Sequence, residues 1–263
     1  MLFSCMQEID IFVFKVIMEL SYIITQEKKV VYNMKYKHTA TSDGVYEQLK
    51  EQILHLELPP GSAISEIETA EKYNISRTPV RDAFKRLERE GLLEIRPHIG
   101  TFISLIDLHA VSDVLYVREV LEFSVLSDLA QIYDNSHDLH IRLILQKQKE
   151  LLDSEMSIEE LSRAFIKSDN EFHTALFDAA GKKNIIKFLY AYNSQYERFR
   201  TFINFNGKED LQKLYESHIQ MIDCIINKDF TTLKDCIRHH LYDGFTSSTD
   251  LVSKFPYYFS QTP

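Results

Sequence analysis

Residues 76–87 read Ser76-Arg77-Thr78-Pro79-Val80-Arg81-Asp82-Ala83-Phe84-Lys85-Arg86-Leu87. At 3.6 residues per turn, Val80, Ala83, Phe84 and Leu87 form an apolar stripe of the kind that packs against a core. Arg77, Arg81 and Lys85 recur at every fourth residue on another face. Such a helix suits the DNA major groove, because cations neutralise phosphates and Arg reads a guanine edge. A solvated amphipathic surface helix is the alternative at this point.

The segments around this helix favour DNA recognition. Apolar spacing predicts one helix after Ser42, and the S-x-x-E pattern that starts at Ser65 predicts a second helix to about Tyr73. Asn74 suits the tight turn that follows, and Gly91 suits the end of the third helix. Residues 92–95 and 101–104 then predict two short strands around a loop. Together these elements predict a winged helix-turn-helix over residues 41–104.

Composition limits how such a domain could bind DNA. The chain has 263 residues, which allows two ordinary domains, and a net charge of −9. Residues 43–104 also carry more Asp and Glu than Lys and Arg. Broad nonspecific binding is therefore disfavoured, and binding must rest on cations gathered on one face, with a marked dependence on salt.

The N-terminal residues 1–40 form an extension to the predicted domains. Residues 9–24 are largely apolar, but the segment is too short for a membrane span, and Asp10, Lys15 and Glu19 make it too charged for one. We interpret Met34 as the natural start and residues 1–33 as the product of an upstream start codon; an amphipathic segment at a membrane surface is the alternative. The three cysteines form no disulfide or metal pattern, so we expect a cytoplasmic protein with no membrane partner.

The second half of the chain is predicted to be all helical, so the fold class is mostly α. Apolar residues recur with helical period, and Gly and Pro are sparse. Six helices are predicted, at about 108–133, 139–152, 158–180, 185–202, 211–226 and 233–251. They indicate a helical bundle over residues 105–251, followed by a tail over residues 252–263.

Four polar residues on these helices are candidate metal ligands. Asp169 and His173 are four residues apart and project from one helical face. His218 and His240 lie on two later helices. Imidazole and carboxylate suit Zn, Ni, Mn or Fe, and four such ligands leave positions open for water or a ligand. Four unrelated polar residues are the alternative that the spacing leaves open.

Several of these motifs resemble known proteins. Pro60-Gly61, residues 76–81, Leu87, residues 90–92 and residues 100–103 resemble the N-terminal signature of the GntR family of bacterial transcription regulators. The second half resembles the FadR-type C-terminal ligand-binding domain of that family, known as FCD. The matching pieces are Arg118 with Glu122, Asp169-x-x-Phe172-His173, Ala180-Gly181 with Asn184, His218, and His239-His240-Leu241.

The resemblance implies a homodimeric regulator, usually a repressor, that binds a palindromic double-stranded DNA operator. Together with Lys85 of the cationic face, the predicted DNA-binding residues are Ser76, Arg77, Thr78, Arg81, His98 and Gly100. Two departures, Ile67 and Thr69, stand where the family often has Arg and Leu. We therefore expect fewer operator contacts from the second helix.

The resemblance also implies a divalent metal ion, Zn, Ni or Mn, held by Asp169, His173, His218 and His240. His240 is preferred to His239 because His218 and His240 reproduce the family spacing of 22 residues. The implied effector is a small organic acid, with Arg118 and Asn184 as effector-binding residues. Arg118 could instead form a salt bridge with Glu122 at i+4, and the inserted Lys182-Lys183 puts the role of Asn184 in question.

Two other functions compete with a regulator. One is a metal-dependent enzyme on a helical bundle, with Glu171 as a base beside the ion. A winged domain argues against it, because a catalytic bundle has no use for a recognition helix. The other is a winged-helix protein-interaction module, which salt-sensitive, sequence-specific gel shifts would distinguish from a DNA-binding protein.

Overall fold

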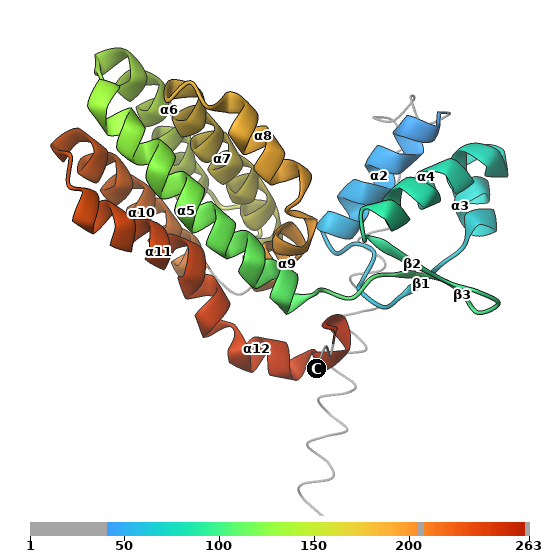
Figure 1. Cartoon of the computed structure of the whole chain (residues 1–263). Coiled ribbons are helices and arrows are strands. Elements are labelled where there is room, and N and C mark those ends of the chain that lie inside the picture. The colour runs from blue at the N-terminus through green and yellow to red at the C-terminus, as the bar shows by residue number, and fades with distance from the viewer. Residues whose placement is uncertain (1–40, 205–207, 261–263) are drawn as a thin grey trace, which may run out of the picture.

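The computed structural model describes residues 41–204 and 208–260, which form two domains side by side (Figure 1). The interpretation of Met34 as the natural start lies outside the described residues. The smaller domain has three helices and three short strands. They are α2 (Ser42–Leu54), β1 (Ala63–Ile64), α3 (Glu66–Tyr73), α4 (Arg77–Arg89), β2 (Leu93–Arg96) and β3 (Gly100–Ile103).

The local signals in the smaller domain act as the sequence predicts. The Ser65 hydroxyl accepts hydrogen bonds from the backbone N–H groups of Ile67 and Glu68 at the start of α3. Asn74 ends that helix in the left-handed region, at φ 53°. The apolar stripe of α4 is at most 1% exposed and forms the domain core with α2. The predicted faces of α4 are therefore confirmed.

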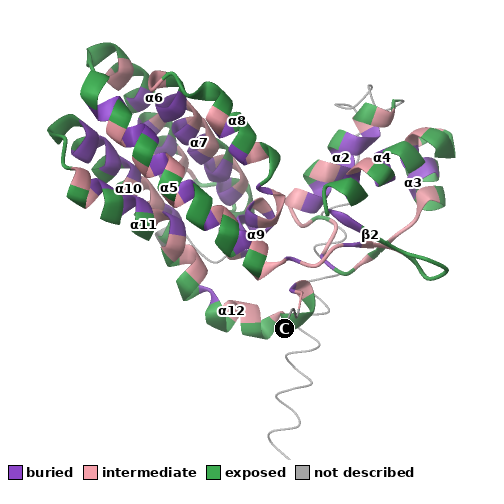
Figure 2. Ribbon diagram, viewed as in Figure 1, coloured by how far each residue is buried: buried purple, intermediate pink, exposed green. Residues whose placement is uncertain are grey.

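The wing is a three-stranded antiparallel sheet in the order β1-β3-β2. The hairpin pairs Leu93 with Ile103 and Arg96 with Gly100, and its tip is exposed (Figure 2). Strand β1 is absent from the sequence prediction, because two residues are too short to show an alternating pattern.

The larger domain is a bundle of helices whose buried residues face inward (Figure 2). Its elements are α5 (Leu108–Ile132), α6 (Asn135–Leu152), α7 (Ile158–Ala179), α8 (Lys183–Ala191), α9 (Ser194–Asn204), α10 (Lys208–Asn227), α11 (Phe230–Ser247), α12 (Thr249–Lys254) and the 3₁₀ turn η1 (Pro256–Tyr258). None of the described helices is long and apolar enough to cross a membrane.

Two predicted helices are each divided in the structure. The helix predicted over residues 185–202 is α8 followed by α9, and the break falls at Tyr192 and Asn193 without any Gly or Pro. Asn193 begins α9: its carbonyl accepts from the Glu197 N–H at 2.9 Å, and its amide donates to the Glu197 carboxylate at 3.0 Å. The helix predicted over residues 233–251 ends at Ser247, and α12 continues in a new direction.

The described part of the predicted tail folds back on the segment between the domains. Ile106 donates to the Tyr258 carbonyl and accepts from the Ser260 N–H, both at 2.9 Å. Phe259 is 4% exposed and packs against Phe202 of α9, with ring centroids 5.2 Å apart. This C-terminal segment therefore fixes the interdomain segment to the bundle.

Candidate functional site

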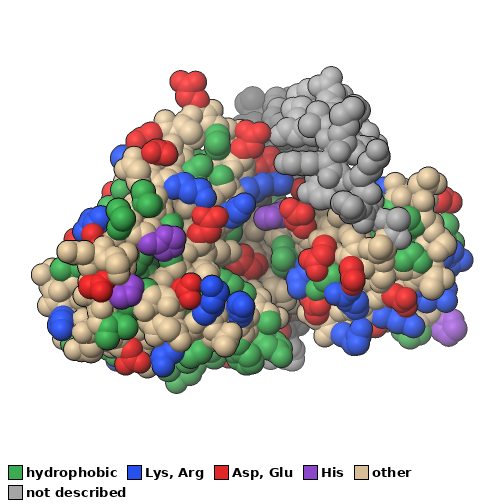
Figure 3. Space-filling view, turned by 90° about the horizontal axis from the view of Figure 1, so that it is seen from above, with side chains coloured by type: hydrophobic (Ala, Val, Ile, Leu, Met, Phe, Trp, Pro, Cys, Tyr) green, Lys and Arg blue, Asp and Glu red, His purple; other side chains and the backbone are tan. Residues whose placement is uncertain are grey.

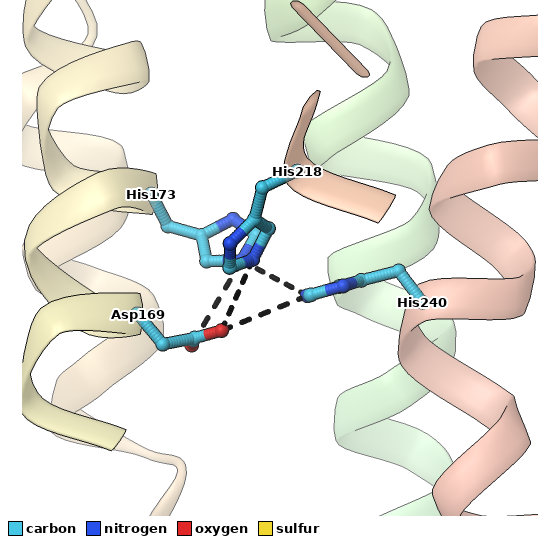
Figure 4. Close-up of side chains that lie close together, drawn as sticks. All are labelled: Asp169, His173, His218 and His240. Carbon is cyan, nitrogen blue, oxygen red and sulfur yellow. Dashed lines mark hydrogen bonds and ion pairs between the residues drawn. The ribbon is translucent and has the colours of Figure 1, made fainter. Parts of the chain in front are cut away.

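The predicted Asp and His residues meet inside the bundle. Asp169 and His173 project from α7 toward His218 of α10 and His240 of α11 (Figure 4). One side-chain ligand atom from each of the four lies within 4.8 Å of the others. All four side chains are at most 4% exposed. Helices that are distant in sequence thus bring one carboxylate and three imidazoles to a single buried point.

The three imidazoles present their Nε2 atoms to the centre of this cluster. His173 Nε2 lies 3.1 Å from His240 Nε2, and His218 Nε2 lies 3.2 Å from Asp169 Oδ1. His173 Nε2 and His240 Nε2 each lie 3.9 Å from an Asp169 oxygen. These distances between ligand atoms are similar to those between neighbouring ligands of one metal ion, when each ligand lies about 2.0–2.2 Å from the ion.

Outer partners fix the rings from behind. His218 Nδ1 lies 2.9 Å from Gln148 Oε1, and His173 Nδ1 lies 3.2 Å from Glu122 Oε2. His240 Nδ1 lies 2.8 Å from Ser217 Oγ, and that hydroxyl donates to the Leu214 carbonyl. Gln148 and Ser217 act as acceptors here, so the assigned proton is on Nδ1 in His218 and His240, whereas His173 Nδ1 lies at ion-pair distance from Glu122 without forming a hydrogen bond.

This assignment turns the Nε2 lone pairs of His218 and His240 and the Asp169 carboxylate toward the point that His173 Nε2 also faces. His218 Nε2 is buried and has no hydrogen-bond partner. Acceptors this close repel one another unless a cation lies among them. The donor set and its orientation therefore fit a divalent metal ion.

Electrostatics keep the cluster in the protonation states that a metal needs. Burial raises the pKa of the Asp169 carboxyl, but Arg200 and the nearby histidines outweigh it and hold that pKa well below its usual range. Burial, with further contributions from neighbouring histidines, lowers the pKa of His240 well below its usual value. Burial also lowers the pKa of His218. The carboxylate is thus charged while these two imidazoles are neutral.

A cationic and aromatic wall adjoins the cluster. Arg118 Nε donates to Glu122 at 2.7 Å, while its two terminal nitrogens are buried and have no hydrogen-bond partner. Arg200 donates to Asp169 at 2.9 Å and to Asn170 at 3.0 Å. The Tyr196 ring lies against both guanidinium groups, at 4.9 Å and 5.5 Å from its centroid. The wall therefore offers unused donors beside the candidate metal centre.

The structure separates the two predicted effector-binding residues. Arg118 forms the salt bridge with Glu122 and also keeps two free donors. Asn184 is exposed on α8, and no contact joins it to the cluster among the residues that the structure describes. The insertion Lys182-Lys183 places it at the start of α8, so we leave Asn184 out of the pocket that we propose below.

The predicted DNA-binding residues lie on α4, at its N-cap, and on the wing of the smaller domain. All seven are exposed: Ser76, Arg77, Thr78, Arg81, Lys85, His98 and Gly100. Figure 3 shows basic side chains gathered over this domain, with acidic side chains among them. His98 and Gly100 have positive φ, at 62° and 151°, which shapes the tip of the wing.

One acidic residue intrudes on the cationic face. The Glu66 carboxylate of α3 lies 3.3 Å from Arg81 Nε and 3.7 Å from an Arg77 nitrogen. Both arginine side chains remain 55% exposed, so they keep donors for another partner. An exposed pair of this kind is weak and exchanges readily.

Two sequence families match the chain. The family described as bacterial regulatory proteins, gntR family, matches residues 41–103, and the FCD domain matches residues 113–243. A helix-turn-helix-type transcriptional regulator in an unstable DNA locus of Streptomyces ambofaciens is 30% identical over 199 residues, which cover 75% of this chain and 80% of that protein. The chain belongs to the GntR family. It is a DNA-binding transcription regulator with an FCD domain, and its relatives are regulators rather than enzymes.

Further relatives agree with this assignment to the GntR family. The transcriptional repressor RspR of Escherichia coli K12 is 25% identical over 205 residues, which cover 76% of this chain and 85% of RspR. Among solved structures, E. coli McbR/YncC has a TM-score of 0.57 at 18% identity, over 81% of this chain and 97% of that one. A GntR regulator from Rhodococcus sp. RHA1 has a TM-score of 0.60 at 17% identity, over 78% and 96%. These two likenesses show the shared fold.

Several residues of this GntR-family site carry no signal in the sequence analysis. Arg200 and Gln148 are buried polar residues that contact the cluster from α9 and α6. A polar residue on the apolar stripe of a helix is the only available signal, and it does not identify the partner. Glu66 lies directly after Ser65 in the sequence, but its contact with Arg81 depends on how α3 packs against α4.

Proposed function

We propose that this protein is a repressor that binds a palindromic operator as a homodimer and responds to a small organic acid at a metal centre in its FCD domain. The observation that supports this proposal most strongly is that three histidine Nε2 atoms and the Asp169 carboxylate converge on one buried point. Since its target is DNA, we expect it to work in the cytoplasm. The name of its relative RspR, a transcriptional repressor, supports the repressor role.

Asp169, His173, His218 and His240 would hold the ion. A divalent ion bound there would supply a Lewis acid that accepts a carboxylate oxygen. Four protein ligands leave room in the coordination shell of Zn, Ni or Mn. Glu122, Gln148 and Ser217 hold the rings in place, as outer partners of metal-ligating histidines do.

Arg118 would bind the effector carboxylate. Its Nε is occupied by Glu122, but its two terminal N–H groups are buried without partners, and such donors are costly unless a ligand satisfies them. A carboxylate accepts two parallel hydrogen bonds from a guanidinium. Arg200 and Arg118 both lie against the Tyr196 ring, and the positive charge of Arg200 would further favour an anionic ligand beside Arg118.

A dimer explains how a few cations could suffice. Each subunit presents a short recognition helix and a wing, and a twofold axis would place two such helices on the two halves of a palindrome. Doubling the contacts doubles the binding free energy without raising the positive charge of the face, which fits the acidic background of the chain.

The adjacent histidines of α11 provide a matched test. His240 faces the cluster, whereas His239 is exposed and contacts the Asp235 carbonyl. We expect H240A to lose bound metal while H239A retains it, as measured by elemental analysis of protein exchanged against each metal. Both variants should still bind operator DNA in gel shifts, where the operator is first identified by selecting genomic fragments with the wild-type protein. Full metal retention in H240A would refute the assignment.

A further inference from the structure

A buried cation without an ion pair lies where the two domains meet. The Arg198 side chain of α9 is 0% exposed. Its guanidinium donates to the carbonyl of Ser104, to the Ser104 hydroxyl at 3.0 Å and to Gln195 at 3.5 Å. Ser104 directly follows β3 of the wing. Within the described parts of the chain, no carboxylate pairs with Arg198, although Arg118 of the same domain pairs with one carboxylate and Arg200 with two.

This arrangement is costly. A buried charge without a counter-ion loses hydration that neutral hydrogen bonds replace only in part. Burial lowers the pKa of Arg198 to about 10, and its Nε has no hydrogen-bond partner. The contact with Ser104 therefore contributes little net stability, so a small change elsewhere can shift the balance between keeping it and breaking it.

Ser104 connects Arg198 to the recognition helix. The Ser104 hydroxyl donates to the Gly91 carbonyl at 2.6 Å, and its N–H donates to the Leu92 carbonyl at 3.1 Å. Gly91 and Leu92 directly follow the C-cap of α4. A shift of Arg198 thus reaches the base of the DNA-reading helix through one residue.

Helix α9, which carries Arg198, also contacts the Asp/His cluster. Arg200 lies two residues after Arg198 and donates to Asp169, while Tyr196 lies two residues before it and stacks on Arg118. Gln195 adds a second anchor, because its side chain accepts from the Asp107 N–H at 3.2 Å. The family matches end at residue 103 and resume at residue 113, so Ser104 and Asp107 belong to a segment outside both.

We propose that Arg198 is the positioning residue through which occupancy of the Asp/His cluster alters the placement of the DNA-binding domain. This inference rests on the proposed function, because it requires that the cluster be occupied and vacated. Arg200 shares the Asp169 carboxylate with any ion held there, so occupancy changes the bond that fixes α9. The helix then moves as a unit, and the hydrogen bonds between Arg198 and Ser104 weaken or strengthen. An ion in the cluster changes this equilibrium only if it binds more tightly to one arrangement, with the Arg198–Ser104 hydrogen bonds strong or weak, than to the other.

The test compares R198M with wild type, using Zn²⁺ alone as the probe. Hydrogen–deuterium exchange is followed in residues 194–204 and 88–104 of the full chain, before and after Zn²⁺ is added to chelator-treated protein. In wild type, we expect Zn²⁺ to change exchange in both segments. In R198M, we expect the change in 194–204 to remain and the change in 88–104 to be lost, with the same Zn²⁺ affinity. R163M is the matched control, because Arg163 also bridges the domains, through Glu57 at 2.8 Å, but its side chain is 33% exposed and pairs with carboxylates.

The outcomes separate the two proposals. Absence of Zn²⁺ binding in wild type refutes the metal centre of the proposed function. Binding of Zn²⁺ without any change in 88–104, or a change that persists in R198M, overturns the role of Arg198 alone. S104A removes the hydroxyl and keeps the carbonyl, so it should retain part of the response. It serves as the second variant if R198M fails to fold.

Discussion

Charged residues gather at two places in this protein, in opposite surroundings. On α4 the cations are in water, and their partner Glu66 forms loose contacts with two arginines that are each 55% exposed. In the bundle, Asp169 and Arg200 are at most 6% exposed and lie 2.9 Å apart. Exposed pairs contribute about 0–1 kcal/mol and exchange readily, whereas removing one partner of a buried pair costs about 3–5 kcal/mol. The outer face is thus free to exchange Glu66 for phosphate, while the inner site keeps its geometry.

The largest expected effect comes from breaking the inner pair. D169N keeps the volume of the side chain but removes the nearer of the two carboxylates beside buried Arg200 and leaves only Glu197, at 3.6 Å, so the free energy of unfolding should fall by up to about 3–5 kcal/mol. Chemical denaturation in the presence of a chelator measures this change without any contribution from bound metal. D178N is the control on the same helix, because Asp178 pairs with Lys183 at the surface. A cost of about 0.5 kcal/mol or less is expected there. Equal losses of unfolding free energy in D169N and D178N would contradict the proposed difference between buried and exposed ion pairs.

The next effect concerns the outer face. R81A should weaken operator binding by about 1–3 kcal/mol if Arg81 reads a base, and the loss should be concentrated at one position of each half-site. Quantitative gel shifts on an operator and its single-base variants measure both quantities. R142A, on an exposed position of α6, is the control and should bind as wild type does. A loss that is equal for every sequence would make Arg81 a phosphate contact instead.

The outer partners of the inner site can be tested in the same way. Gln148 is 0% exposed and bridges His218 to the Ser168 carbonyl, so Q148A leaves the ring without its orienting acceptor. Metal affinity should fall about 10–100-fold, as is usual when such partners are removed. Q146A is the matched control two residues away, because Gln146 is exposed and contacts only Glu150 in the described structure. Isothermal titration of both variants with Zn²⁺ would show whether orientation matters or only the four ligands.

The two regions also differ in how far the sequence predicts them. The recognition helix could be predicted because its two faces depend on spacing along one helix, and the structure confirms both faces. The four residues of the inner cluster were selected by resemblance, since spacing alone relates Asp169 to His173 but not to residues on α10 and α11. Arg200 was missed because it lies beyond the break at Asn193, and that break depends on a local side-chain hydrogen bond rather than on Gly or Pro. Contacts between distant elements, such as Arg198 with Ser104, have no sequence pattern to reveal them.

The smallest effect tests whether Glu66 limits nonspecific binding. E66Q removes the carboxylate that lies between Arg77 and Arg81, so both cations become available to phosphates. We expect affinity for non-operator DNA to rise by less than about 1 kcal/mol and its salt dependence to steepen, because more counterions are released on binding. E68Q changes the net charge equally but lies at an exposed position of the same helix without contact to either arginine, so it isolates the local effect from the general one. If the two variants gain affinity equally, Glu66 acts only through the overall charge of the domain; if E66Q alone gains it, the weak outer pairs restrain binding to phosphates wherever the bases do not match.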